Sequence, residues 1–163
     1  MRTETGWEII YDQFVPDTMN HLETVTMVGN GYLGTRGSFA EGYPGANRAT
    51  FVHGVFDDTP IVFTELANTP DWTALLIKLN EQVFSLRDGT LHSFSTSLNL
   101  KNGVLTRQVD WESADNQRIT ITFERFACLH NVHLLMQRVR ICSQNFDGQV
   151  EIQAPINGYA LNE

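Results

Sequence analysis

The second half of the chain alternates apolar and polar residues with a period of two over several consecutive stretches. Successive side chains of a strand point to opposite faces, so this alternation predicts half-buried antiparallel strands. The predicted strands are Ser93–Leu100, Val104–Trp111, Arg118–Phe126, Val132–Cys142 and Val150–Ile156. Turn signals separate them, above all Asn102-Gly103, because both central positions of such a hairpin turn favour positive φ. Asp147-Gly148 is a second signal of the same kind.

Each predicted strand gathers its larger apolar residues on one face. These shared faces are Phe94, Thr96, Leu98 and Leu100 in the first strand; Leu105, Val109 and Trp111 in the second; Ile119, Ile121 and Phe123 in the third; and Val132, Leu134 and Met136 in the fourth. We expect Trp111 to lie in the core for this reason.

The first half of the chain is less regular. Thr24–Val28, Ala49–Phe56 and Trp72–Leu79 are predicted strands, and Val83–Leu86 is a short return strand. Thr59–Pro70 is bounded by prolines and is predicted to end in a loop. No long stretch has the 3.6-residue period of a helix. The chain is therefore predicted to be an all-β protein, an antiparallel β-sandwich with little helix.

The composition fits one domain over residues 1–163, with a net charge of −8 and 42% hydrophobic residues. This charge disfavours nucleic acid and anionic membranes as partners, because both require clusters of Lys and Arg. No apolar run approaches the ~20 residues of a membrane-spanning helix, and the first ten residues lack the apolar region of a secretory signal. Cys128 and Cys142 are predicted to be buried, reduced thiols, so we expect a cytoplasmic protein. An uncharged substrate such as a sugar is compatible with this charge.

Five glycines and several polar residues fill the segment Glu23–Gly42, ETVTMVGNGYLGTRGSFAEG, which is where we look first for function. Its GNGYLG run matches the glycine pattern of a dinucleotide-binding loop. Such a loop needs a helix directly after the third glycine, whose N-terminus holds the pyrophosphate. The residues that follow, TRGSFAEGYPGANR, are too rich in Gly and Pro for a helix. The sequence therefore argues against a dinucleotide site.

No metal site or catalytic set is predicted from the residues themselves. His130 and His133 would point to opposite faces of a strand, so they would not share a metal. Candidate carboxylates for glycosidic chemistry are Glu23, Glu41, Asp57, Asp58 and Glu65, but the sequence does not give their separation, and a structural or solvated role is favoured for each. Trp72 and Tyr32 could instead offer stacking platforms for a sugar.

Five stretches in order carry a resemblance to a known family: GWEIIYDQF, ETVTMVGNGYLGTRGSFAEGYPG, ELANTPDW, SLNLKNGVLTRQVDW and ERFACLH. From about Trp7 onward the chain resembles the N-terminal domain of glycoside hydrolase family 65, which includes maltose, trehalose and kojibiose phosphorylases and some acid trehalases. The resemblance implies a large β-sandwich that precedes a catalytic (α/α)6 barrel. It also implies inverting cleavage of an α-glucosidic disaccharide by inorganic phosphate as co-substrate, with a glutamate of the barrel as general acid. No metal or organic cofactor is implied.

The residues of the barrel, including the general acid, have no counterpart in this sequence, so no catalytic residue is assigned. We expect a non-catalytic fragment that supports the barrel, its partner in the parent chain. A candidate barrel-facing loop and its surroundings comprise Asn30, Tyr32, Arg36, Glu41 and Trp72. Two alternatives stay open: a stand-alone carbohydrate-binding module, and the N-terminal domain of a trehalase-type hydrolase that uses water in place of phosphate. The sandwich is also expected to be cut short, with exposed edges that promote self-association and a homodimer.

Overall fold

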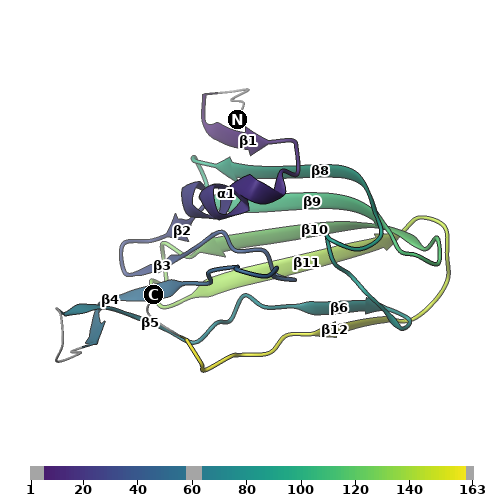
Figure 1. Ribbon diagram of the computed structural model, residues 1–163. Helices are drawn as coiled ribbons and strands as arrows, with labels where there is room; N and C mark the ends of the chain where they lie inside the picture. The colour runs from purple at the N-terminus through teal and green to yellow at the C-terminus, as the bar shows by residue number, and fades with distance from the viewer. Residues whose placement is uncertain (1–5, 58–63, 161–163) are drawn as a thin grey trace.

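The computed structural model describes residues 6–57 and 64–160, which form three antiparallel sheets and one short helix (Figure 1). The largest sheet has the strand order β1-β8-β9-β10-β11, and smaller sheets have the orders β12-β6-β7 and β2-β3-β4-β5. The strands are β1 Glu8–Tyr11, β2 Val28–Gly29, β3 Leu33–Thr35, β4 Thr50–Asp57, β5 Glu65–Asn68, β6 Leu76–Leu79, β7 Gln82–Val83, β8 Thr90–Asn99, β9 Val104–Glu112, β10 Arg118–Ala127, β11 Leu135–Ser143 and β12 Val150–Gln153. The prediction of an antiparallel all-β fold is confirmed.

The inner face of the large sheet is the one that the alternating pattern predicts. Val109 of β9 stands opposite Phe94 of β8 and Ile121 of β10, so one row of apolar side chains crosses three strands. Val109, Ile119 and Ile121 have no exposed surface. Trp111 is also buried, as predicted, and its indole Nε1 donates to the carbonyl of Asp88 at 2.7 Å. Burial of these side chains is the main source of stability for the sheet.

One layer of mixed structure covers this face of the large sheet. It contains the helix α1 (Met19–Val25), the short 3-10 helix η1 (Pro16–Thr18) before it, the glycine-rich segment and β6, whose Ile77 and Leu79 lie in the core cluster. Met19, Leu22 and Phe39 belong to the same buried cluster as Phe94 and Val109, so the core lies between the two layers. Within the described part of the chain, no helix is long and apolar enough to cross a membrane.

The predicted strand Thr24–Val28 is wrong, because most of it lies in or just after α1. Three α1 residues spaced as on one helical face, Met19, Leu22 and Glu23, are buried. The Thr26 hydroxyl donates to the carbonyl of Leu22 at 2.8 Å and closes the last turn. The β-branched residues of this stretch favour a strand locally, but burial of the helical face outweighs that preference.

The strand predicted at Val132–Cys142 begins later than expected, because a turn occupies its first residues. Leu134 N donates to the carbonyl of Asn131 at 3.0 Å, so pairing begins only at Leu135. Leu134 and Met136 therefore lie on the exposed outer face, at 41% and 45% exposure. The inner face instead carries Gln137, whose side chain binds a buried arginine; this polar inner residue hides the true register in the sequence.

The turn between β8 and β9 lies where the sequence places it but has a different geometry. Gly103 has a φ of +67°, whereas Asn102 is not among the residues with positive φ, so the turn lacks the two left-handed positions expected. The four residues 100–103 separate the strands, and the Asn99 side chain accepts from the amides of Lys101 and Asn102. Leu100 lies in this turn and is 49% exposed rather than on the buried face.

The other predictions for the first half are met in part. The run Ala49–Phe56 matches β4, whereas only the end of Trp72–Leu79 is a strand, β6. Asp71 forms an isolated bridge with Asn157, and residues 72–75 lie between this bridge and the start of β6. The Val83–Leu86 return is reduced to β7. Thr59–Pro70 contains β5 and ends in a loop after Asn68, as predicted, and residues 58–63 lie outside the described part. Both cysteines are free, but the prediction that both are buried is wrong, because Cys142 is exposed and Cys128 is only half-buried.

Candidate functional site

The GNGYLG run forms the turn of a β-hairpin between β2 and β3, not a strand-to-helix turn. The Asn30 side chain organises this turn, because its Oδ1 accepts from the amides of Tyr32 and Leu33 at 3.0 and 2.8 Å. Its Nδ2 donates to the carbonyls of Cys128 and Val132 at 2.8 and 3.0 Å. Asn30 therefore both shapes the hairpin and fastens it to the loop that connects β10 with β11.

Tyr32 lies at the same end of the molecule as Asn30. Its ring meets the ring of His133 edge to face, with 4.6 Å between centroids, and its carbonyl accepts from the amide of His53 at 2.8 Å. The hairpin is thus packed between β4 and the β10–β11 loop. Tyr32 keeps part of its surface accessible.

Gly37 marks the point where the glycine-rich segment crosses α1 at close range. Its amide donates to the carbonyl of Glu23 at 2.9 Å. A Cβ at this position would lie 2.3 Å from the Thr26 hydroxyl oxygen and 2.8 Å from the Thr26 carbonyl oxygen. Because backbone atoms fill the space, only glycine fits here.

Glu23 is a fully buried carboxylate beneath this crossing. Its oxygens accept from the amide of Phe39 at 2.8 Å and the hydroxyl of Tyr43 at 2.9 Å. Arg36 Nε lies 3.6 Å from the carboxylate. Burial raises the pKa of Glu23, and the hydrogen bonds with the Arg36 charge oppose that rise only in part. Burial and the neighbouring Glu23 also raise the pKa of Tyr43.

Glu41 forms a two-point ion pair with Arg107 of β9, with N–O distances of 2.8 and 2.5 Å. The side chains are 4% and 6% exposed. The Arg107 guanidinium also lies between two aromatic rings, 4.1 Å from the centroid of Phe39 and 4.2 Å from that of Phe123. This pair fastens the glycine-rich segment to the inner face of the sheet.

Arg125 of β10 lies on the same inner face of the large sheet as Arg107 of β9. It donates to Gln137 Oε1 at 2.7 Å and to the carbonyl of Arg36 at 3.1 Å, and its guanidinium carbon lies 5.6 Å from the ring centroid of Trp72. Burial, together with the nearby charges of Arg107 and Arg48, lowers the pKa of Arg125 to about 10. The Trp72 Nε1 donates to the Thr50 hydroxyl at 3.2 Å.

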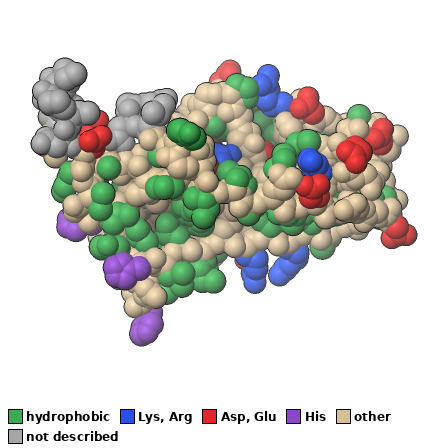
Figure 2. All heavy atoms as spheres, turned by 90° about the horizontal axis from the view of Figure 1, so that it is seen from below, with side chains coloured by type: hydrophobic (Ala, Val, Ile, Leu, Met, Phe, Trp, Pro, Cys, Tyr) green, Lys and Arg blue, Asp and Glu red, His purple; other side chains and the backbone are tan. Residues whose placement is uncertain are grey.

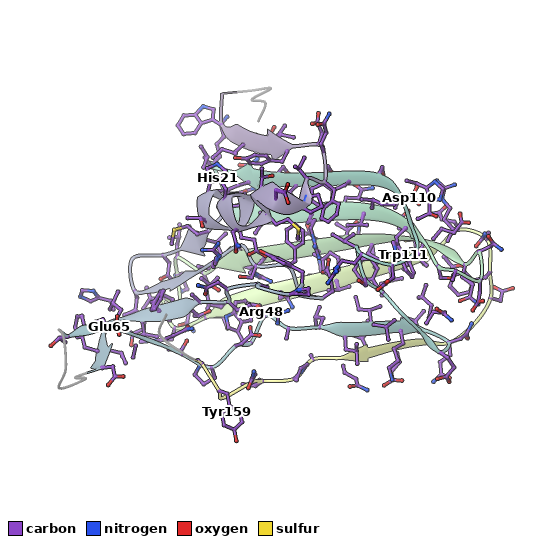
Figure 3. The ribbon with its side chains drawn as sticks, viewed as in Figure 1. His21, Arg48, Glu65, Asp110, Trp111 and Tyr159 are labelled. Carbon is purple, nitrogen blue, oxygen red and sulfur yellow. The ribbon has the colours of Figure 1, made fainter. Side chains whose placement is uncertain are left out.

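Seven side chains, which we call the charged layer, lie between the large sheet and its covering segment: Glu23, Arg36, Glu41, Arg48, Asp71, Arg107 and Arg125. The sequence analysis did not identify Arg48 and Asp71. They pair at 2.6 Å, and Arg48 also donates to the carbonyls of Phe39 and Ala40. Burial acts to raise the pKa of Asp71, but hydrogen bonds from Arg48 and Thr73 outweigh it and hold this pKa below its ordinary value. Figure 3 shows Arg48 near the middle of the molecule, whereas Glu65 and Tyr159 lie at its periphery.

The sequence-predicted residues therefore fall into two groups. Arg36, Glu41 and Trp72 each contact one of the two inward arginines, Arg107 or Arg125. Asn30 and Tyr32 instead lie together at the hairpin turn. The missed members, Arg107 and Arg125, do leave a signal, because each is a charged residue at an inward position of an alternating strand.

The candidate carboxylates do not converge on a common reaction centre. Glu23 and Glu41 are engaged by different partners inside the domain. Asp57 and Glu65 stand opposite each other across β4 and β5, and Asp58 lies outside the described residues. No group of three His, Cys, Asp or Glu side chains that could hold a metal ion occurs within residues 6–57 and 64–160. The charged side chains are suited to hold the glycine-rich segment against the large sheet.

Comparison with known proteins agrees with this architecture. Residues 9–163 match the family model described as glycosyl hydrolase family 65, N-terminal domain. The chain is 35% identical over 157 residues to a kojibiose phosphorylase of Halothermothrix orenii, covering 96% of this chain and 20% of that protein. An alpha,alpha-trehalose phosphorylase of Thermoanaerobacter brockii is 27% identical, with coverage of 96% and 22%.

A solved structure has the same fold over most of the chain. A putative kojibiose phosphorylase from human microbiome superimposes with a TM-score of 0.80 at 21% identity, covering 90% of this chain and 21% of that one. The chain thus spans about a fifth of the length of the curated relatives that it matches.

Proposed function

Because the chain belongs to glycosyl hydrolase family 65, as its N-terminal domain, we propose that it supports the catalytic barrel of a longer disaccharide phosphorylase. The parent enzyme would cleave an α-glucosidic disaccharide such as kojibiose, trehalose or maltose with inorganic phosphate, inverting the anomeric centre. Relatives named kojibiose phosphorylase and alpha,alpha-trehalose phosphorylase support this reading. The sugar, the phosphate and the general acid would all belong to the barrel.

The single observation that carries a supporting role is the use of charged residues inside the domain. The side chains of Glu23, Glu41 and Arg107 are buried and bind one another's segments instead of forming an open site. Inverting glycoside chemistry needs two carboxyl groups facing a shared sugar and nucleophile. Side chains that are locked in internal ion pairs serve rigidity, as a domain that holds a neighbouring barrel in place requires.

We propose that the barrel packs on the end of the molecule where the β2–β3 hairpin meets the β10–β11 loop. Figure 2 shows hydrophobic side chains gathered over the left half of the lower face, the end that carries β4 and β5. Exposed apolar residues there include Phe56, Leu66, Leu129 and Leu134. Asn30 and Tyr32 adjoin this surface. The barrel-facing role stays a prediction for them and for Arg36, Glu41 and Trp72.

A comparison of three proteins tests this supporting role. These are the Halothermothrix orenii phosphorylase, a form that lacks its matched N-terminal fifth, and a fusion in which the present chain replaces that fifth. We expect the shortened form to lose phosphorolysis of kojibiose and the fusion to recover it. Full activity of the shortened form would show that the domain is dispensable and would refute the proposal.

Two alternatives are separated by other measurements. A stand-alone carbohydrate-binding module would bind gluco-oligosaccharides without a barrel, which calorimetric titration of this chain would detect. Trp72 is partly buried and hydrogen-bonded to Thr50, and Tyr32 packs against His133, so both proposed platforms have internal contacts. A trehalase-type hydrolase differs in the barrel, so the reaction of the parent protein with water or phosphate decides that alternative.

We further propose a homodimer and a cytoplasmic location, as expected from the sequence. In the isolated chain, the exposed apolar side chains near the hairpin, which the proposed barrel would cover in the parent protein, supply a surface for self-association.

A further inference from the structure

The charged layer contains one more positive charge than negative charges among the described residues. Arg107 pairs with Glu41, Arg48 pairs with Asp71, and Arg36 lies beside Glu23. Arg125 forms no ion pair with any described carboxylate, although it is only 6% exposed. A buried charge is normally paired, because desolvation without a counter-charge is unfavourable.

A narrow pocket opens directly beside this unpaired cation. Its volume is about 20 Å³, and its lining includes Thr96, Arg107, Glu124, Arg125 and Gln137. Glu124 accepts from Arg138, and this pair contributes no net charge. The pocket therefore lies in a positive field.

Thr96 gives an independent sign that the pocket has an occupant. This residue is 2% exposed, and its hydroxyl has no hydrogen-bond partner in the described part of the chain. A buried hydroxyl without a partner is unfavourable, so such groups normally bind protein, water or an ion. Thr96 lies on the same inner face as Arg107, its register partner across β8 and β9.

The volume of the pocket limits its occupant to one water molecule or one small ion. About 10–15 Å³ of such volume accommodates one water molecule, so 20 Å³ accommodates one water or an ion only slightly larger. Phosphate, sulfate or a carboxylate group is too large. The excess positive charge favours an anion over water.

We propose that this pocket is a halide site, in which a single chloride ion accepts a hydrogen bond from the Thr96 hydroxyl and neutralises the unpaired charge of Arg125. The ion would act as a structural counter-charge within the charged layer. It takes no part in the proposed phosphorolysis, so the site and the proposed function stand or fall separately.

Bromide diffraction tests the site directly. Crystals grown without chloride are soaked in sodium bromide, and anomalous scattering is recorded. We expect a bromide peak in contact with Thr96 Oγ1 and the Arg125 guanidinium. Water at this position, or bromide confined to the outer surface, would overturn the proposal.

Thermal unfolding supplies the solution test, with sodium chloride replacing sodium gluconate at constant ionic strength. We expect the Tm to rise with chloride and to saturate, as for a single site on the folded state. Thr96→Val should weaken the apparent chloride affinity about tenfold, since it removes one hydrogen bond to a charged partner. Thr106→Val, on the opposite face of β9, is the matched control and should leave that affinity unchanged.

A purely structural role for Thr96 would lower the Tm of Thr96→Val equally in both salts and leave its chloride response intact. That outcome would contradict the proposal. If the variant does not fold, the bromide peak in the unaltered protein still decides the question.

Discussion

The Glu41 carboxylate and the Arg107 guanidinium meet in a two-point ion pair that joins the glycine-rich segment to β9 across the core. Both side chains are almost fully buried. The most distinctive stretch of the sequence is therefore held to the sheet by charge as well as by apolar packing. This relationship makes the segment part of the scaffold and sets the first prediction.

Glu41→Gln should lower the free energy of unfolding by about 3–5 kcal/mol, because it leaves the Arg107 charge buried without its partner. Chemical denaturation monitored by tryptophan fluorescence measures this change. Glu124→Gln is the matched control, since it breaks an ion pair whose Arg138 side chain is 64% exposed. That variant should change stability by about 1 kcal/mol or less. Equal effects of the two variants would contradict a buried role for Glu41.

Gly37→Ala should destabilise the fold by about 1–3 kcal/mol through overpacking. The added methyl group would meet Thr26 side-chain and backbone atoms within 3 Å. Gly34→Ala serves as a control, because the nearest atom to its added Cβ would be Met27 Cε at 3.8 Å. We expect little change there. A Tm for Gly37→Ala that matches the Gly34→Ala value would show that the close crossing does not exist in solution.

Stability should decrease as pH rises above the ordinary glutamate value of 4.5, because burial raises the pKa of Glu23. In that range the folded protein holds a proton that the unfolded chain has released, so deprotonation favours unfolding. Glu23→Gln stays neutral and should flatten this part of the stability profile. The stability of the variant relative to the natural protein should therefore increase from pH 4.5 upward.

Asp71 acts in the opposite direction at lower pH. Its pKa is held below the ordinary value of 3.8, so its contribution is present above that pH and is lost as the pH falls below it. Asp71→Asn should remove this acid-side loss. Unfolding curves at closely spaced pH values separate the two carboxylates, and a Glu23→Gln profile parallel to the natural one would contradict the assignment for Glu23.

Self-association should depend on the exposed apolar residues of the β10–β11 loop and the start of β11. Leu129 and Met136 are 78% and 45% exposed, respectively. Replacing both with Ser should shift the proposed dimer toward monomer by removing apolar contact area. Light scattering across a wide concentration range measures the effect. A clean monomer for the unaltered chain at every concentration would remove the basis for the dimer.

The sequence pattern predicts strands well wherever one face is buried and the other is accessible. The alternation through Ile119, Ile121 and Phe123 gives the correct inner face because each polar neighbour points outward. It fails at β11, where Gln137 is polar yet faces inward toward Arg125. It also fails at α1, whose short apolar face is masked by β-branched residues.

The charged layer could be anticipated only in part. Arg36, Glu41 and Trp72 stand out in a motif-rich stretch, whereas Arg48 and Asp71 pair across 23 positions with no local signal. Contacts of this kind depend on the sheet topology, which the alternation alone does not determine. The inward arginines on β9 and β10 are the part of the layer that the alternating pattern does indicate.

Release of glucose 1-phosphate by the purified 163-residue chain tests the central claim most directly. The chain is incubated with phosphate and kojibiose, trehalose or maltose, and the product is measured enzymatically against a buffer control. A supporting domain without catalytic groups should give only the background rate for all three sugars. A rate that increases in proportion to the amount of chain would contradict the account, because it would place the catalytic groups within these residues.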